Sequence, residues 1–147
     1  MQTSLHKQKI YALLIAAVCF IAMLLPWITV QGTALRDGFS NWGFLSLTGI
    51  GAVLVATLMD EKTKVYQGNF KFIAIGGFFA VWLGGFITML TKNSVSGGYY
   101  QGYGMANVVG TGYGAWLIML AAATGTALAS GQLKIPENKK PPEPPTS

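Results

Sequence analysis

The stretch KFIAIGGFFAVWLGGFITMLTK, from Lys71 to Lys92, decides the fold of this chain. No residue between the two lysines is charged, and as an α-helix with a rise of about 1.5 Å per residue the stretch would be roughly 30 Å long, the thickness of a bilayer's hydrocarbon core. Gly76, Ala80 and Gly84 recur at every fourth position, so they share one helical face on which another backbone can come close. We therefore predict a membrane-spanning helix with a face suited to helix contact.

Charge is scarce along the whole chain. Of its 147 residues, 52% are hydrophobic and 10% are charged, whereas about 25% are charged in an average soluble domain. The charge-free runs cover 10–35, 38–59, 72–91 and 93–133. Backbone polar groups in lipid must be bonded within their own segment, so long runs without alternation predict helices rather than barrel strands.

We therefore predict an all-α fold, a polytopic membrane protein with a bundle of four transmembrane helices. The transmembrane domain covers 9–130, and its segments follow in chain order. They are a polar tail over 1–8, spans at about 9–30, 43–59, 72–91 and 114–130, a Gly- and Tyr-rich outer loop over 92–113, and a Pro- and Lys-rich tail over 131–147 that we expect to be disordered.

The distribution of basic residues predicts the orientation. With four spans, the N-terminal tail, the second connection and the C-terminal tail lie on one side of the membrane, and they carry eight of the 10 lysines and arginines. The opposite side carries two, Arg36 and Lys92. The positive-inside rule then predicts a multi-pass protein of the plasma membrane with both termini in the cytoplasm.

Small residues repeat at four-residue spacing in two further spans, as they do in the third. Such faces allow close helix packing, within the bundle or with a partner. The predicted packing or interface residues are Gly76, Ala80, Gly84, Thr48, Ala52, Ala56, Ala121, Gly125 and Ala129.

Residues for chemistry are missing from the predicted spans. Membrane enzymes and ion pathways need ionisable groups inside the bundle, and no span interior contains one. His6 and Cys19 are single residues of their kinds, which leaves no Ser/His/Asp triad, no paired haem ligands and no Cys/His metal cluster. We predict no catalytic, cofactor or metal residues, and the few scattered lysines predict no nucleic-acid partner.

One short motif suggests a different function. Thr111, Gly112, Tyr113 and Gly114 resemble part of the potassium-channel filter Thr-Val-Gly-Tyr-Gly, whose carbonyl oxygens replace an ion's hydration shell. Gly110 stands where that family has its threonine, and the segment before the motif is broken by glycines where a pore helix would lie. The four residues are kept as candidate pore or outer-loop residues.

The predicted topology also resembles that of claudin-type four-helix membrane proteins, with two outer loops and cytoplasmic termini. Trp27 and the stretch Asn41-Trp42-Gly43 are similar to the first-loop tryptophans of that family. The family's Gly-Leu-Trp motif with two cysteines is absent, and the first loop is far too short for the claudin sheet. The resemblance therefore implies a shared topology and no more.

These observations favour a small non-catalytic membrane protein that acts as an interaction, scaffold or accessory subunit. Its partners would be the lipid bilayer and either further copies of itself or a larger membrane complex. The alternative is a homo-oligomeric channel or carrier for an ion or a small neutral solute, lined by the glycines of the third span and by the outer Gly/Tyr segment.

Overall fold

The computed structural model describes residues 5–30, 33–39, 42–95, 109–135 and 145. Within these residues the chain forms four helices and three strands. The helices are α1 (Lys7–Leu24), α2 (Gly43–Met59), α3 (Gly68–Val95) and α5 (Tyr113–Ser130), and the strands are β1 (Pro26–Val30), β2 (Thr33–Asp37) and β3 (Val109–Thr111).

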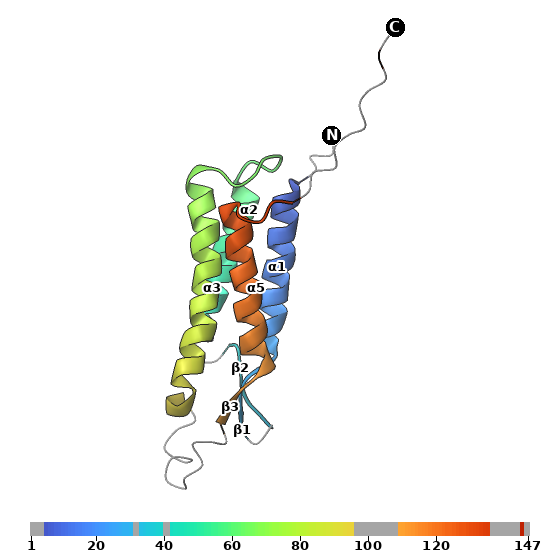
Figure 1. Cartoon of the computed structure of the whole chain (residues 1–147). Coiled ribbons are helices and arrows are strands. Elements are labelled where there is room, and N and C mark those ends of the chain that lie inside the picture. Colours follow the sequence, from blue (N-terminus) through green and yellow to red (C-terminus); the bar gives the residue numbers. More distant parts are fainter. Residues whose placement is uncertain (1–4, 31–32, 40–41, 96–108, 136–144, 146–147) are drawn as a thin grey trace.

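The four helices lie side by side as a bundle (Figure 1). Each helix packs against two others, in the ring α1–α2–α3–α5. Three of them, α1, α3 and α5, are long and apolar enough to cross a membrane, and α2 is a shorter apolar helix of 17 residues. The prediction of a mostly helical, apolar bundle is confirmed by these helices.

The two ends of the bundle differ in character (Figure 1). At one end α1 begins, α5 ends and the turn over 60–67 joins α2 to α3; we call it the basic end because lysines lie in all three segments. At the opposite end, which we call the sheet end, the three strands form an antiparallel sheet in the order β2-β1-β3. In that sheet Ile28 lies opposite Thr111, and Val30 lies opposite Val109.

The sheet corrects two expectations. The first span was predicted to continue to Val30, but α1 ends at Leu24 and the chain becomes extended at Leu25, with φ −80° and ψ 158°. A residue that precedes proline avoids the helical region, and Ile28, Thr29 and Val30 are β-branched residues that favour strands. The early end of α1 lengthens the first loop, whose strands join β3 in a sheet, so the prediction of an all-α fold was incomplete.

Glycine allows a close backbone contact between α2 and α3. A Cβ atom added at Gly77 would lie 2.8 Å from the Gly49 carbonyl oxygen, and one added at Gly49 would overlap the carbonyl of Gly77. Real Cβ atoms do not approach other atoms so closely, so only glycine permits this backbone separation. Val53 and Val81 are fully buried beside the contact.

Among the described residues Trp27 is the largest fully buried side chain, and it anchors the sheet end of the core. Its indole N–H donates to the Ala22 carbonyl over 2.8 Å. Gly38 and Gly114 face the indole so closely that a Cβ at either position would lie 2.6 Å from a ring atom. The first strand, the first loop and the start of α5 therefore meet around one aromatic ring.

Candidate functional site

A buried ion pair lies at the basic end of the bundle. The Nζ atom of Lys9, in the first turn of α1, is 3.0 Å from a carboxylate oxygen of Asp60, the residue that ends α2. The Lys9 side chain is completely buried and that of Asp60 is 7% exposed. Lys9 also donates to the Glu61 carbonyl, and its Nζ lies 5.5 Å from the centre of the Tyr66 ring. The ammonium group thus has an anion, a carbonyl and an aromatic face in place of water.

Hydrogen bonds extend this pair into a cluster that joins three helices. The side-chain amide of Gln8 donates to the Leu128 carbonyl of α5 over 2.8 Å, and its oxygen accepts from the Tyr66 backbone N–H over 3.1 Å. The Tyr66 hydroxyl is hydrogen-bonded to the hydroxyl of Thr57 on α2. We call Gln8, Lys9, Thr57, Asp60 and Tyr66 the basic-end cluster; among the described residues, no buried side-chain nitrogen or oxygen lacks a hydrogen-bond partner.

The surroundings of Asp60 keep its carboxylate charged. Burial acts to raise the pKa of Asp60, but the hydrogen bond from Lys9, those from the backbone N–H groups of Glu61 and Gln67, and the charge of Lys9 outweigh burial and hold the pKa below its ordinary value of 3.8. Burial raises the pKa of Tyr66 above 10.0 despite its bond to Thr57, and the nearby Asp60 charge acts in the same direction as burial. At neutral pH the cluster therefore contains one ion pair and a neutral phenol.

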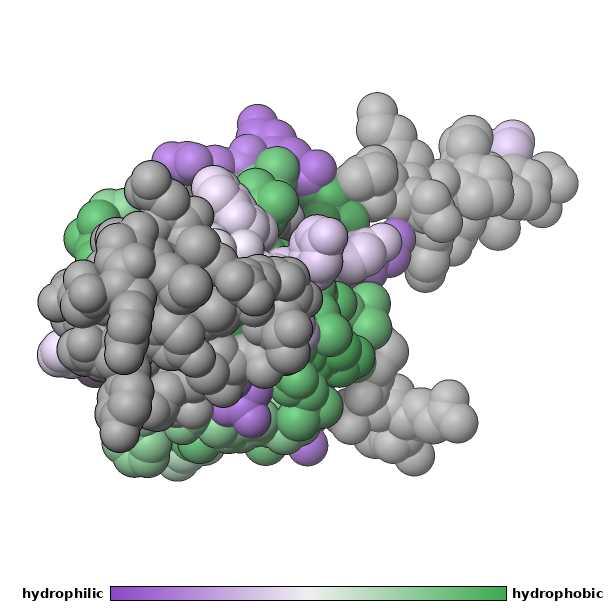
Figure 2. Space-filling view, turned by 90° about the horizontal axis from the view of Figure 1, so that it is seen from below, coloured by the Kyte–Doolittle hydropathy of each residue, from purple (hydrophilic) through white to green (hydrophobic). Residues whose placement is uncertain are grey.

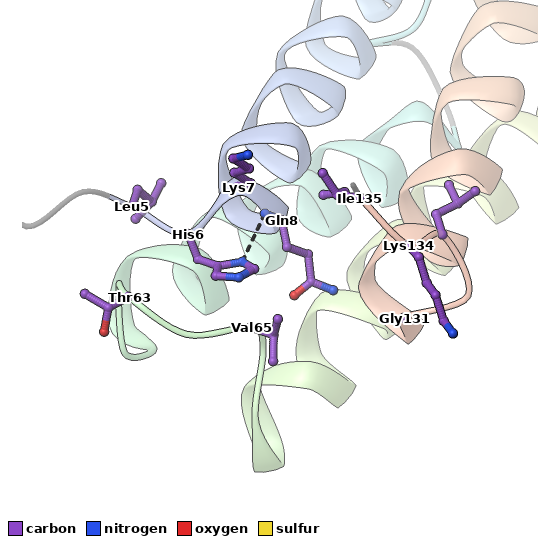
Figure 3. A pocket seen from close by; sticks show the side chains of 10 residues that line it. Leu5, His6, Lys7, Gln8, Thr63, Val65, Gly131, Lys134 and Ile135 are labelled. Atoms are coloured by element: carbon purple, nitrogen blue, oxygen red, sulfur yellow. Dashed lines mark hydrogen bonds between the residues drawn. The ribbon is translucent and has the colours of Figure 1, made fainter. Parts of the chain in front are cut away.

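A cavity of about 620 Å³ opens beside the basic-end cluster (Figure 3). Its lining comes from the start of α1, the turn between α2 and α3, and the segment that follows α5. The lining combines basic and apolar side chains. They include His6, Lys7, Lys134, Leu5, Val65 and Ile135.

The predicted contact face of α3 is divided between the core and the surface. Gly84 is buried against α2, where an added Cβ would overlap a serine side chain. Ala80 is half-buried, and Gly76 is exposed: apart from its neighbours and the backbone of its own helix, no atom lies within 4 Å of the position its Cβ would take. The close backbone contact with α2 is made by Gly77. The predicted seam is therefore not a single face of the bundle.

The predicted faces of α2 and α5 are divided in the same way. A Cβ at Gly125 would lie 2.5 Å from the Phe78 ring of α3, so this glycine makes room for that side chain. Ala56, Gly125 and Ala129 are buried, Ala52 and Ala121 are half-buried, and Thr48 is exposed. Whether the exposed members of these faces contact a partner stays a prediction.

The filter-like motif lies where β3 leads into α5. Thr111 ends the strand, Gly112 caps the helix, and Tyr113 and Gly114 form its first turn. The Gly112 N–H donates to the Trp27 carbonyl over 2.8 Å, and Gly114 contacts the indole of the same tryptophan. Both glycines thus have a packing role in the single chain, whereas the Tyr113 side chain is 83% exposed.

The sequence reasoning missed the basic-end cluster. The first predicted span begins at Lys9 and the second ends just before Asp60, and no pairing between these two residues was predicted. A signal was present, because in a four-span topology the start of the first span and the end of the second span lie on the same side. A cation at the start of one helix and an anion at the end of its neighbour could then have been predicted to form an ion pair.

Neither a metal site among the described residues nor a known relative indicates a reaction for this chain. Among the described residues, no group of three or more His, Cys, Asp or Glu side chains could hold a metal ion. The predicted outer loop falls largely on 96–108, outside the described residues. Comparison with family models, with curated proteins and with solved structures found no match.

Proposed function

We propose that this chain is a non-catalytic subunit of the plasma membrane that docks another transmembrane helix against the exposed face of α3. The observation that supports the proposal is the position of Gly76. It lies one turn from Phe72 and one turn from Phe79, whose side chains are 73% and 51% exposed. Between these two rings the helix surface has a notch, because nothing lies near the Cβ position of the glycine.

A glycine in this position is otherwise unfavourable. Glycine in a helix costs roughly 0.5–1 kcal/mol relative to alanine, and contact with lipid tails gives nothing in return. Gly77, the next residue, uses its missing side chain for the contact with α2, but Gly76 makes no such contact within the chain. A partner helix that enters the notch would bring the two backbones close together, as small-residue faces do in membranes.

The proposed placement in the membrane has its own support. Hydrophobic residues make up much of the flank visible from the sheet end (Figure 2). The exposed side chains of Leu58, Leu90 and Leu120 lie on three different helices and are each between 64% and 68% exposed. Lysines gather at the basic end, which the positive-inside rule assigns to the cytoplasm, together with both termini.

The test adds bulk to the notch without disturbing the core. Gly76→Leu is expected to abolish association, measured by light scattering in mild detergent and by energy transfer between labelled copies in nanodiscs. Ala17→Leu is the matched control, because Ala17 is a small exposed residue on α1. Gly84→Leu is unsuitable, since its side chain would collide with α2 and unfold the bundle.

The partner can be another copy or a different membrane protein, and one pair of variants covers both. A stoichiometric partner that co-purifies with wild type and with Ala17→Leu, but not with Gly76→Leu, supports the proposal equally. If Gly76→Leu changes neither self-association nor any stoichiometric partner, helix docking on α3 is refuted. Flux into liposomes above that of protein-free vesicles, lost in Tyr113→Ala, would favour the channel or carrier instead.

A further inference from the structure

A second hollow continues from the basic-end cavity along the outside of the bundle. It has a volume of about 240 Å³ and lies between α1 and α5, where Tyr11, Ile15 and Leu128 line it. Leu133, Lys134 and Ile135 line both hollows, so the segment after α5 forms their common border. We call this second hollow the α1/α5 groove.

The two hollows differ in chemistry and in depth. The cavity is bordered by His6, Lys7 and Lys134 at the basic end, whereas the α1/α5 groove has mostly apolar walls. Ile15 is eight residues beyond Lys7 along α1, a distance of about 12 Å at the helical rise. A single leaflet has a hydrocarbon thickness of about 15 Å, half that of the bilayer core, so the cavity and the groove together extend over a length comparable to one leaflet.

The charge at the mouth is positive. No Asp or Glu is among the described residues that line either hollow. Lys9 is neutralised by Asp60, but Lys7 and Lys134 have exposed side chains and border the cavity from two sides. Nδ1 of His6 accepts the Gln8 backbone N–H over 3.1 Å, so the neutral ring carries its proton on Nε2 as a further donor.

We propose that the cavity and the α1/α5 groove together bind one anionic phospholipid. The phosphate lies between Lys7 and Lys134, and one acyl chain follows the groove past Tyr11 and Ile15. Basic pockets between helices on the cytoplasmic side are suited to acidic head groups, and the combination of a basic mouth with an adjoining apolar groove matches an amphiphile better than a free phosphate or a peptide. The inference rests on the proposed bilayer location and is independent of helix docking on α3.

Native mass spectrometry of the full chain in a neutral detergent tests the proposal. Phosphatidylglycerol and phosphatidylcholine with identical acyl chains are added in turn. We expect one phosphatidylglycerol molecule to bind in preference to phosphatidylcholine. At about 1 kcal/mol for each lysine, the double variant Lys7→Gln/Lys134→Gln should bind phosphatidylglycerol about 30-fold more weakly.

Two further variants locate the site. Lys62→Gln/Lys71→Gln removes the same charge at the same end of the bundle from residues that do not line the cavity, and it should bind phosphatidylglycerol like wild type. Thr124→Trp fills the α1/α5 groove from an exposed position and should weaken binding without loss of charge. Equal binding of the two lipids, or equal loss in both lysine double variants, would overturn the proposal. Disrupted docking in Gly76→Leu with normal lipid binding would separate this site from the proposed function.

Discussion

The clearest quantitative test compares two ion pairs of equal length and different burial. The Lys9–Asp60 and Lys64–Glu61 pairs both have an N–O distance of 3.0 Å, but the first is 0% and 7% exposed and the second is 55% and 54% exposed. At 3.0 Å the attraction of two unit charges is about 1.4 kcal/mol in bulk water and about 5.5 kcal/mol at an effective dielectric constant of about 20. The substitutions Lys9→Met and Lys64→Met are therefore chemically identical changes in different surroundings.

The expected losses differ several-fold. Removal of one partner of a buried pair costs about 3–5 kcal/mol, because an unpaired charge remains, whereas an exposed pair screened by water contributes about 0–1 kcal/mol. At about 2–4 °C for each kcal/mol in a chain of this size, Lys9→Met should lower the Tm by roughly 6–20 °C and Lys64→Met by a few degrees at most. The Tm is measured in detergent through the change in tryptophan fluorescence on heating.

A double variant identifies the cause of the loss. Lys9→Met/Asp60→Asn leaves no unpaired charge and should recover part of the stability that Lys9→Met loses. Equal losses in Lys9→Met and Lys64→Met would refute the reasoning, because they would mean that water reaches the Lys9 ammonium in the folded protein.

Three further predictions concern pH and packing. The pKa of Asp60 is lower in the folded protein than its ordinary value of 3.8, so the stability from its ion pair and its backbone hydrogen bonds is fully present above pH 3.8 and is lost as the pH falls through the folded-state pKa. Tm measured across acid pH should therefore fall more steeply in wild type than in Lys9→Met, which keeps only the backbone hydrogen bonds to Asp60. Gly77→Ala should cost about 1–3 kcal/mol by forcing α2 and α3 apart, whereas Gly76→Ala should be neutral or should stabilise the chain by about 0.4–1 kcal/mol, as unfolding in detergent by added SDS will show. Trp27→Phe should cost about 1–3 kcal/mol in the same assay, since it removes the buried hydrogen bond from the indole to the Ala22 carbonyl and replaces a fully buried ring by a smaller one. Trp116→Phe should be neutral because Trp116 is 55% exposed.

The bundle could be predicted from the sequence because long charge-free runs have few structural solutions. A run such as 72–91 is too apolar for a soluble helix and too long for a strand, so α3 follows from composition and length alone. The end of α1 was harder to predict from the sequence, because the residues from Leu25 to Val30 are as apolar as the helix before them. Pro26 carried the necessary information, but proline is also tolerated in membrane helices, and the predicted span at 9–30 continued through it.

The contact faces of the helices were predicted less well than the helices themselves. Four-residue spacing places Gly76, Ala80 and Gly84 on one side of α3, but it does not determine which side turns inward. That choice depends on the rotation of α3 about its axis, which is fixed by contacts with α2 and α5. Gly77 and Gly84 together fit α2, and their spacing of seven residues, two helical turns, was present in the sequence but not used.

The order of the strands has a consequence for biosynthesis. The hairpin of β1 and β2 can form as soon as residue 37 has been made, but the other edge of β1 receives its partner β3 only after α2 and α3 have been made. Because Gly112 and Gly114 complete the surroundings of Trp27 at the same moment, the sheet end closes last and joins the last helix to the first. A chain interrupted after α3 would expose an unpaired strand edge and an uncovered indole, two features that membrane quality control could recognise as signs of an unfinished protein.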